Sequence, residues 1–489
     1  MLKILFLNPE VNLNWFSKSQ IELSRNTAMI VNPNIKYPSE FFHISAMLKK
    51  EGFNDLLLID PLIQNLSLKE TAVKTKEFNP DVILIPTEIW LSARCNIPFT
   101  NHVKTTINSL HREGIKAKIV VSGPHGTIFP EKTLRETDAD IAIQGEPENT
   151  FVEIVKNFRN LENVKGISFF RDDKFVRNPP AYLSTMSSLP AADYSIFPVE
   201  KYFSNNSGTL FPVITSRGCV YSCSYCSSSV LNKKYRERRL EDVFEEIDVL
   251  AGKGLKKFTF PDEIFTVNKS RTLKICSFLA EKHPGMTYTI QTRSEFLNDE
   301  IMVALKKSGC VWIGIGFESA SQEVLDRANK NGKVESVEKA INLGKKYGVQ
   351  IHLFAISLLS GETKDTISQT MQFFRKVKPD SVSIVSATPI PGTRLWEEGI
   401  AEGKLKGDSY EEALKKTGTI GNDFKEKDVK EYNIIIPVEI SFSSGTKFMV
   451  NKLHLNKVYI APQLIPHYIK KLLKFTLLKI QGNKKLFSN

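Results

Sequence analysis

The chain has 489 residues, enough for two to four domains, and its 41% hydrophobic and 25% charged residues are ordinary proportions for a globular protein. These proportions exclude a disordered chain, and the lack of any apolar run of about 20 residues argues against a membrane-spanning helix. The net charge of +12 comes mostly from nine lysines that follow Glu439 without any acidic residue. The excess charge is therefore local, and nucleic acid is not an expected partner.

Cysteine usage and the start of the chain both indicate a cytoplasmic protein. Three of the six cysteines lie within eight residues, whereas a secreted disulfide framework would spread them more evenly. The first residues lack the cleavage site of a signal peptide and are typical of a buried strand. Clustered thiols in a cytosolic chain favour a metal site.

Residues 1–150 alternate short apolar runs with helical patterns. The expected strands are at residues 3–7, 55–59, 82–85, 119–121 and 141–143. Apolar strands separated by helices predict an α/β fold, a doubly wound, Rossmann-like domain with a parallel sheet. In such sheets ligands bind beyond the carboxyl ends of the strands. The candidate ligand contacts at these ends are Asn8, Thr87, Gly123, His125, Gly145 and Glu146.

Residues 151–205 are expected to form a connector that contains a hairpin turning at Asp172 and Asp173. A second series of βα units follows over residues 206–400, and it predicts a partial (β/α)6 barrel of the TIM type. Active sites of such barrels lie at the carboxyl ends of the strands. Residues 401–489 are expected to form a small helical C-terminal region. The expected barrel strands are at 212–216, 257–260, 287–292, 312–317, 351–356 and 381–385.

The strongest signal is the C-x3-C-x2-C motif of Cys219, Cys223 and Cys226, in the loop after the first barrel strand. Thiolates are soft ligands that select zinc, copper(I) or iron–sulfur clusters. A structural zinc site needs four ligands, and no fourth Cys or His is near in the sequence. Three thiols on one tight loop favour a [4Fe–4S] cluster with one iron left open. The alternative is a zinc site completed from elsewhere in the chain.

This motif, with the aromatic Tyr225 before its last cysteine, resembles that of the radical S-adenosylmethionine (SAM) superfamily over roughly residues 211–400. The resemblance implies that the three cysteines bind a [4Fe–4S] cluster whose open iron chelates SAM. Reduction then cleaves SAM to a 5′-deoxyadenosyl radical, so an external electron donor of the flavodoxin or ferredoxin type is implied. The resemblance places Tyr225 against the adenine.

Polar residues at other strand ends fit the same family. The resemblance assigns Glu318, at the end of the fourth strand, to the ribose hydroxyls, and a carboxylate that accepts two hydroxyl hydrogens makes a charge-assisted contact. The other implied cofactor contacts are Asp262 and Glu263 at the amino group, Arg293 at the carboxylate, Ser319 beside Glu318, and Gly361 and Glu362 near the adenine.

The N-terminal domain resembles the cobalamin-binding domain of one branch of this superfamily. The segments at 122–127 and 140–146 carry glycines after strands, where the backbone can approach a large flat ligand. The D-x-H-x-x-G motif that supplies a histidine to cobalt in many cobalamin proteins is absent, and His125 does not stand in that context. The branch includes members that hold cobalamin without such a histidine. The alternative is a degenerate domain that binds nothing.

The resemblance implies a cobalamin-dependent methyltransferase that acts on an unactivated carbon of its substrate. A radical cyclase or rearrangement enzyme would use the same parts, and the sequence does not separate the two. A methylthiotransferase is disfavoured, because the N-terminal domain holds only Cys95 where three further cysteines are needed. The alternative without catalysis is a zinc-stabilised binding protein docked on a membrane.

Residues 464–480 carry apolar residues at helical spacing among lysines, which predicts a basic amphipathic helix. Such a helix can lie on the anionic inner face of a membrane, and it would suit a lipid-like substrate. Docking of the helix on the barrel, with a small soluble substrate, is the alternative.

Overall fold

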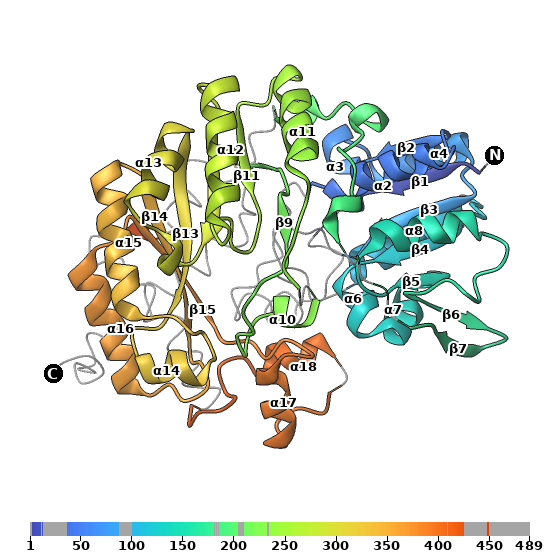
Figure 1. The fold of residues 1–489 in the computed structure, drawn as a ribbon. Helices are drawn as coiled ribbons and strands as arrows, with labels where there is room; N and C mark the ends of the chain where they lie inside the picture. The colour runs from blue at the N-terminus through green and yellow to red at the C-terminus, as the bar shows by residue number, and fades with distance from the viewer. Residues whose placement is uncertain are drawn as a thin grey trace.

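The computed structural model places two seven-stranded sheets side by side (Figure 1). The first sheet belongs to the N-terminal part of the chain and the second to residues from 211 onward. The residues that the structure describes are 2–10, 12, 37–87, 100–179, 181, 183, 185–203, 210–231, 234–407, 409–424 and, as backbone, 447–448.

Five parallel strands in the order β2-β1-β3-β4-β5 form most of the first sheet. This order confirms the doubly wound fold, because the strand order reverses between β1 and β3, and ligands of such sheets bind at this switch point. The strands are β1 (Ile4–Leu7), β2 (Leu56–Ile59), β3 (Val82–Pro86), β4 (Lys118–Ser122) and β5 (Ile141–Ile143). The main helices are α2 (Ser39–Lys50), α4 (Leu68–Phe78), α5 (Asn101–Arg112), α7 (Pro130–Thr137) and α8 (Pro147–Lys156).

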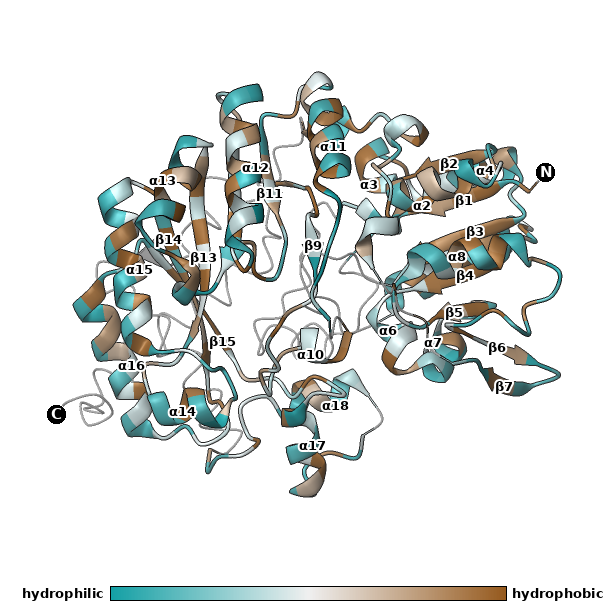
Figure 2. Cartoon of the chain, in the orientation of Figure 1, coloured by the Kyte–Doolittle hydropathy of each residue, from teal (hydrophilic) through white to brown (hydrophobic). Residues whose placement is uncertain are grey.

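Side chains on β1 alternate between two cores. Ile4 and Phe6 pack with the apolar side chains of α2 and α8, whereas Leu5 and Leu7 pack with those of α4, α5 and α7. Because both faces are covered, the five parallel strands are mostly apolar, as Figure 2 shows.

The hairpin of β6 (Ile167–Arg171) and β7 (Lys174–Arg177) turns at Asp172 and Asp173, whose φ angles are 46° and 59°. Positive φ at both central residues is the geometry of a tight hairpin turn. The sequence interpretation placed this hairpin in a connector, but β6 pairs antiparallel with β5 and extends the first sheet. The buried residues of β6 complete the core and cover the edge of β5, which would otherwise lack a partner on that side.

The second sheet is parallel and open, which confirms a partial barrel. Five of the six expected strands are present at about the expected residues, and the sixth, expected at 212–216, is reduced to two residues, 211–212. Strand β16 (Lys447–Phe448) adds a seventh that was not predicted. Helices cover the outer face (Figure 1). The six strands are β8 (Phe211–Pro212), β11 (Lys257–Phe260), β12 (Thr287–Thr292), β13 (Cys310–Glu318), β14 (Gln350–Ser357) and β15 (Ser381–Ser386). The covering helices are α11 (Leu240–Gly252), α12 (Lys269–Lys282), α13 (Asp299–Lys307), α15 (Val334–Tyr347) and α16 (Lys364–Val377).

A small helical region follows the barrel, as expected. Helices α17 (Arg394–Ala401) and α18 (Tyr410–Lys415) lie at the bottom of Figure 1, between the barrel and the N-terminal half. Residues 464–480, with the predicted basic helix, lie outside the described residues. In the part of the chain that the structure describes, no helix has the length and apolar character needed to span a membrane.

Aromatic side chains join the two halves into one core. The ring of Phe211 on β8 lies 5.1 Å from that of Tyr37, which precedes α2, and Tyr37 lies 5.2 Å from Tyr202 of the connecting segment. All three side chains are nearly fully buried, within a hydrophobic cluster that continues from Ile4 to Val382. The two sheets therefore share a core.

We predict that Phe211→Ala lowers the free energy of unfolding by about 3–5 kcal/mol, because it opens a cavity in this shared core. Chemical denaturation would measure the change. Val311→Ala, at a position where the side chain is 43% exposed, is the matched control and should cost less than about 0.5 kcal/mol. Equal effects of the two changes would show that Phe211 has no special place in the core.

Candidate active site between the two sheets

The cysteine loop runs from β9 (Ser216–Arg217) to α10 (Ser228–Leu231). Gly218 begins the loop with a φ of 92°, a conformation that glycine adopts without strain. Three hydrogen bonds of the loop backbone hold the loop in place. The Gly218 amide donates to the Glu263 carboxylate at 3.0 Å, the Ser224 amide donates to the Ala328 carbonyl at 2.9 Å, and the Ser224 carbonyl accepts from the Leu395 amide at 2.9 Å.

The three thiols lie on this braced loop. Burial raises the pKa of Cys219 to about 11 and also raises that of Cys226, so both thiols stay protonated until a metal displaces the protons. Within the described residues, no three Cys, His, Asp or Glu side chains converge into a ready-made metal site. Three soft sulfur donors within eight residues nevertheless match the donor set of an iron–sulfur cluster.

Glu318 ends β13 in a left-handed conformation with a φ of 65°, next to a register shift that turns the end of the strand. Its carboxylate accepts from the Lys330 ammonium at 2.8 Å, and both side chains are nearly buried. Burial, followed by the charge of Glu318, raises the pKa of Tyr225 well above its usual value. A Cβ at Gly316 would lie 2.7 Å from the Lys330 ammonium, so a larger residue there would displace the tip of this side chain.

The sequence analysis did not identify Lys330. Burial lowers the pKa of its ammonium, but the charges of Glu318 and Cys223 outweigh this effect and raise the pKa. Lys330 is therefore a fixed cation between Glu318 and the cysteine loop. The signal for it was weak, since it is one lysine among many and follows its partner by twelve residues.

Arg293 lies across the cysteine loop. Its guanidinium carbon is 3.7 Å from the centre of the Tyr221 ring, a cation–π contact. The same guanidinium donates to the Glu295 carboxylate at 2.7 Å and to the Asn331 carbonyl at 2.8 Å. Arg293 therefore lies beside the loop, and its contact with the SAM carboxylate stays a prediction.

Asp262, at the end of β11, is buried and braces the approach to the loop. It accepts from the Thr215 amide at 2.9 Å, from the Thr215 hydroxyl at 2.6 Å and from the Ser216 hydroxyl at 2.5 Å. Burial raises the pKa of this carboxyl. Glu263 braces Gly218 in the same way. A direct contact of Asp262 or Glu263 with SAM stays a prediction.

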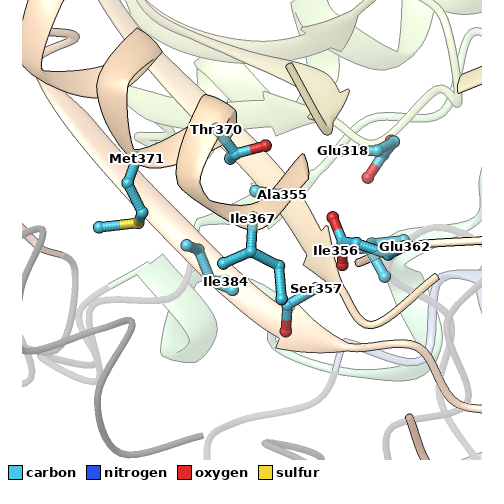
Figure 3. Close-up of a pocket in the computed structure, with 9 residues that line it drawn as sticks. All are labelled: Glu318, Ala355, Ile356, Ser357, Glu362, Ile367, Thr370, Met371 and Ile384. Atoms are coloured by element: carbon cyan, nitrogen blue, oxygen red, sulfur yellow. The ribbon is translucent and has the colours of Figure 1, made fainter. Parts of the chain in front are cut away.

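A small pocket lies at the carboxyl ends of β13 and β14, and in Figure 3 Glu318 and Glu362 lie at the end opposite Met371. Glu362 accepts from the Leu358 amide and lies 3.5 Å from the Ser319 hydroxyl. Burial raises the pKa of Glu362 to about 8. Gly361 has a φ of 82° and packs against Arg327. The structure thus brings Glu318, Ser319 and Glu362 together.

The N-terminal candidates line the carboxyl edge of the first sheet. Asn8 donates to Asp60 at 2.6 Å, and the Thr87 hydroxyl donates to the Ser122 carbonyl at 2.8 Å. Gly123 follows β4 and Gly145 lies two residues after β5. Their φ angles of 113° and 89° favour glycine, so the backbone at these two positions carries no side chain. An edge with bare backbone at two neighbouring strand ends fits a large flat ligand such as cobalamin.

His125 is buried, and its ring lies 5.1 Å from that of Tyr410 on α18. The small C-terminal region therefore reaches the same edge of the first sheet. The sequence analysis did not predict this contact, which joins residues far apart in the chain.

Glu146 lies between the two sheets. It accepts from Arg217 at 2.8 Å and from Arg236 at 2.7 and 2.9 Å, and Arg217 also donates to Glu148 at 2.7 Å. Arg217 directly precedes the cysteine loop. The sequence analysis had assigned Glu146 to cobalamin, whereas here it contacts the barrel half; Arg217, Arg236 and Glu148 were not identified.

The raised pKa of Glu362 predicts a pH-dependent stability. Its pKa is 4.5 in the unfolded chain and about 8 when folded, so its stabilising contribution is full below pH 4.5 and is lost as the pH rises through 8. Glu362→Gln should flatten the decline of the unfolding free energy across this window, measured by chemical denaturation at several pH values. The exposed Glu397→Gln change should leave the decline as it is. Parallel curves for wild type and Glu362→Gln would contradict the assignment.

Comparison with known proteins agrees with both halves of the site. Residues 213–374 match the family model of the radical SAM superfamily, and residues 28–155 match that of the B12 binding domain. These two families account for the expected cofactors: a [4Fe–4S] cluster and SAM for the first, and cobalamin for the second.

Sequence relatives and a solved structure extend this agreement. The chain is 31% identical over 376 residues to the uncharacterized methyltransferase PH0819 of Pyrococcus horikoshii, across 75% of this chain and 79% of the relative. It is 25% identical over 415 residues to an anaerobic magnesium-protoporphyrin IX monomethyl ester cyclase of Rubrivivax gelatinosus, across 82% of this chain and 69% of the cyclase. The radical SAM methyltransferase TsrM of Kitasatospora setae, solved with cobalamin and a [4Fe–4S] cluster, has a similar fold, with a TM-score of 0.66 at 15% identity over 83% of this chain and 76% of TsrM. The chain is therefore a member of the radical SAM superfamily, in the branch that carries an N-terminal B12-binding domain.

Proposed function

We propose that this enzyme is a cobalamin-dependent radical SAM methyltransferase that methylates an unactivated carbon of a small-molecule substrate. The observation that carries the proposal is the place of the cysteine loop. Arg217, just before Cys219, bonds to Glu146, just after the last parallel strand of the first sheet. The ligand-binding ends of both sheets therefore open toward one boundary. The name of the Pyrococcus relative supports methyl transfer.

When bound, the cluster with SAM supplies a hydrogen-abstracting radical, and cobalamin supplies the methyl group. In the proposed site the three cysteines hold the cluster. Lys330 holds the Glu318 carboxylate in place, so that its oxygens can accept from the ribose hydroxyls of SAM. Tyr225, next to Glu318, offers an aromatic face for the adenine.

Ring formation without methyl transfer is the second candidate. The similarity to the Rubrivivax cyclase extends over 82% of this chain, more than the 75% covered by the methyltransferase of Pyrococcus, although at lower identity. Membership of an enzyme family removes the zinc-stabilised binding protein from consideration.

Methyl-labelled SAM distinguishes the two candidates. With anaerobically reconstituted enzyme, cobalamin, an external electron donor and a panel of candidate substrates, we expect one substrate to gain the labelled methyl group, detected by mass spectrometry. A product that instead loses hydrogen and carries no label would establish the cyclase and contradict methyl transfer.

The cysteine assignment is tested by iron analysis. Anaerobically prepared Cys219→Ala, Cys223→Ala and Cys226→Ala should each lose the cluster, because three thiolates are needed to hold it. Cys276→Ala should keep it, since that thiol is buried beside Tyr288 at the base of the barrel. Full iron content in the triple cysteine variant would overturn the assignment.

We propose that the basic residues of the C-terminus place the enzyme on anionic membranes, where a lipid-like substrate would be collected. Each lysine near an anionic surface contributes about 1 kcal/mol, and salt weakens this attraction. Full-length protein should float with anionic liposomes at low salt and be released by high salt or by deletion of residues 464–489. Neutral liposomes are the control. A protein that ignores anionic liposomes at low salt would favour a soluble substrate.

A further inference from the structure

The guanidinium of Arg217 is enclosed by carboxylates from the other half of the molecule. Arg217 lies 2.8 Å from Glu146 and 2.7 Å from Glu148, whose side chains are 6% and 0% exposed. Arg236 binds Glu146 from another direction at 2.7 Å. Two carboxylates and two guanidiniums thus neutralise one another in a buried cluster, which we call the arginine bridge (Glu146, Glu148, Arg217 and Arg236).

On the barrel side, the arginine bridge contacts the chain at the start of the cysteine loop. Arg217 and Arg236 face each other as partners in the short antiparallel ribbon of β9 and β10 (Arg236–Glu237). Only Gly218 separates Arg217 from Cys219. A shift of the Arg217 guanidinium would therefore be passed to Cys219 through one residue whose amide is already fixed by Glu263.

On the N-terminal side, the carboxylates are themselves held. The amide of Gly145, directly before Glu146, donates to Thr127 at 3.0 Å, and Glu146 also accepts from the Leu183 amide at 2.8 Å. Glu148 lies in the first turn of α8, where the helix dipole favours a negative charge. The bridge therefore connects two fixed ends.

The arginine bridge is a costly way to join two domains. Taking charges out of water offsets much of their attraction, and the apolar packing around Phe211 already joins the halves. What paired, directional charges add is one defined orientation, since two hydrogen bonds fix the plane of a guanidinium. In this protein that orientation is imposed on Arg217, two residues before Cys219.

We propose that Glu146 and Glu148 are positioning residues for the iron–sulfur cluster, acting through Arg217, so that the cobalamin-binding domain sets the geometry of the cluster loop. This inference rests on the proposed function for the presence of the cluster. It adds that the N-terminal domain, besides holding its own cofactor, holds the first cysteine of the other cofactor in place.

Iron release to a chelator tests the inference on the reconstituted, full-length holoenzyme under anaerobic conditions. Glu146→Gln and Glu148→Gln should each release iron about ten-fold faster than wild type, as is common when a residue that supports a metal ligand is removed. The electron paramagnetic resonance spectrum of the reduced cluster should also change. Arg217→Lys keeps the charge but loses the planar guanidinium, so it should also release iron faster than wild type.

Glu246→Gln is the matched control. Glu246 pairs with Arg238 at 2.7 Å and is as buried as Glu148, but it lies on α11 and does not touch Arg217. This variant should lose similar thermal stability and yet release iron at the wild-type rate with an unchanged spectrum.

Two results would overturn the inference. One is a wild-type release rate and spectrum for Glu148→Gln, or for Arg217→Lys if Glu148→Gln does not fold. The other is equal acceleration by Glu246→Gln, which would make the effect one of general destabilisation. A wild-type protein that takes up no iron would instead contradict the proposed function, so the two failures are distinguishable.

Discussion

The burial of Arg217 between Glu146 and Glu148 is the contact on which the arrangement of the site depends most directly. The two carboxylates are hidden from water and Arg217 is largely so, and each charge would be strongly destabilising without the others. Their pairing requires the end of β5, the start of α8 and the base of the cysteine loop to meet. The carboxyl ends of the two parallel sheets, each of which is a ligand-binding edge, are thereby turned toward one another.

In the barrel half of the site, the buried polar side chains at the strand ends are also hydrogen-bonded to nearby residues. Asp262 accepts hydrogen bonds from the segment before the loop, and Lys330 donates one to Glu318. Arg293 donates to Asn331 and to Glu295. The loop is thus braced from the ends of several strands before any cofactor is considered. Such preorganisation lets the protein place a reactive cofactor and exclude water with little further movement.

Local patterns in the sequence predicted most of the fold. Apolar runs located the five parallel strands of the first sheet, because strands covered on both faces are mostly apolar. The second βα series located six strands of the barrel, although several of these alternate apolar and polar residues. The two-residue strand β16 was missed, because a pair of residues carries no periodicity. The hairpin at Asp172 was recognised from its turn, but its partner strand was not, since pairing with β5 is a tertiary contact. Cys219, Cys223 and Cys226 stood out because their spacing is local.

The parts of the site that were missed are long-range pairs. Arg217 and Glu146 are 71 residues apart, and neither has a neighbour in the sequence that marks it as half of an ion pair. The sequence showed Glu146 only as a polar residue at a strand end, and the structure pairs it with Arg217 and Arg236 of the barrel half.

The central claim, that one chain carries both cofactors, is tested most directly by metal and corrinoid analysis of the anaerobically purified full-length protein. The account predicts about four irons, four sulfides and one cobalamin per chain. Zinc without iron, or iron without any bound cobalamin after reconstitution, would contradict it.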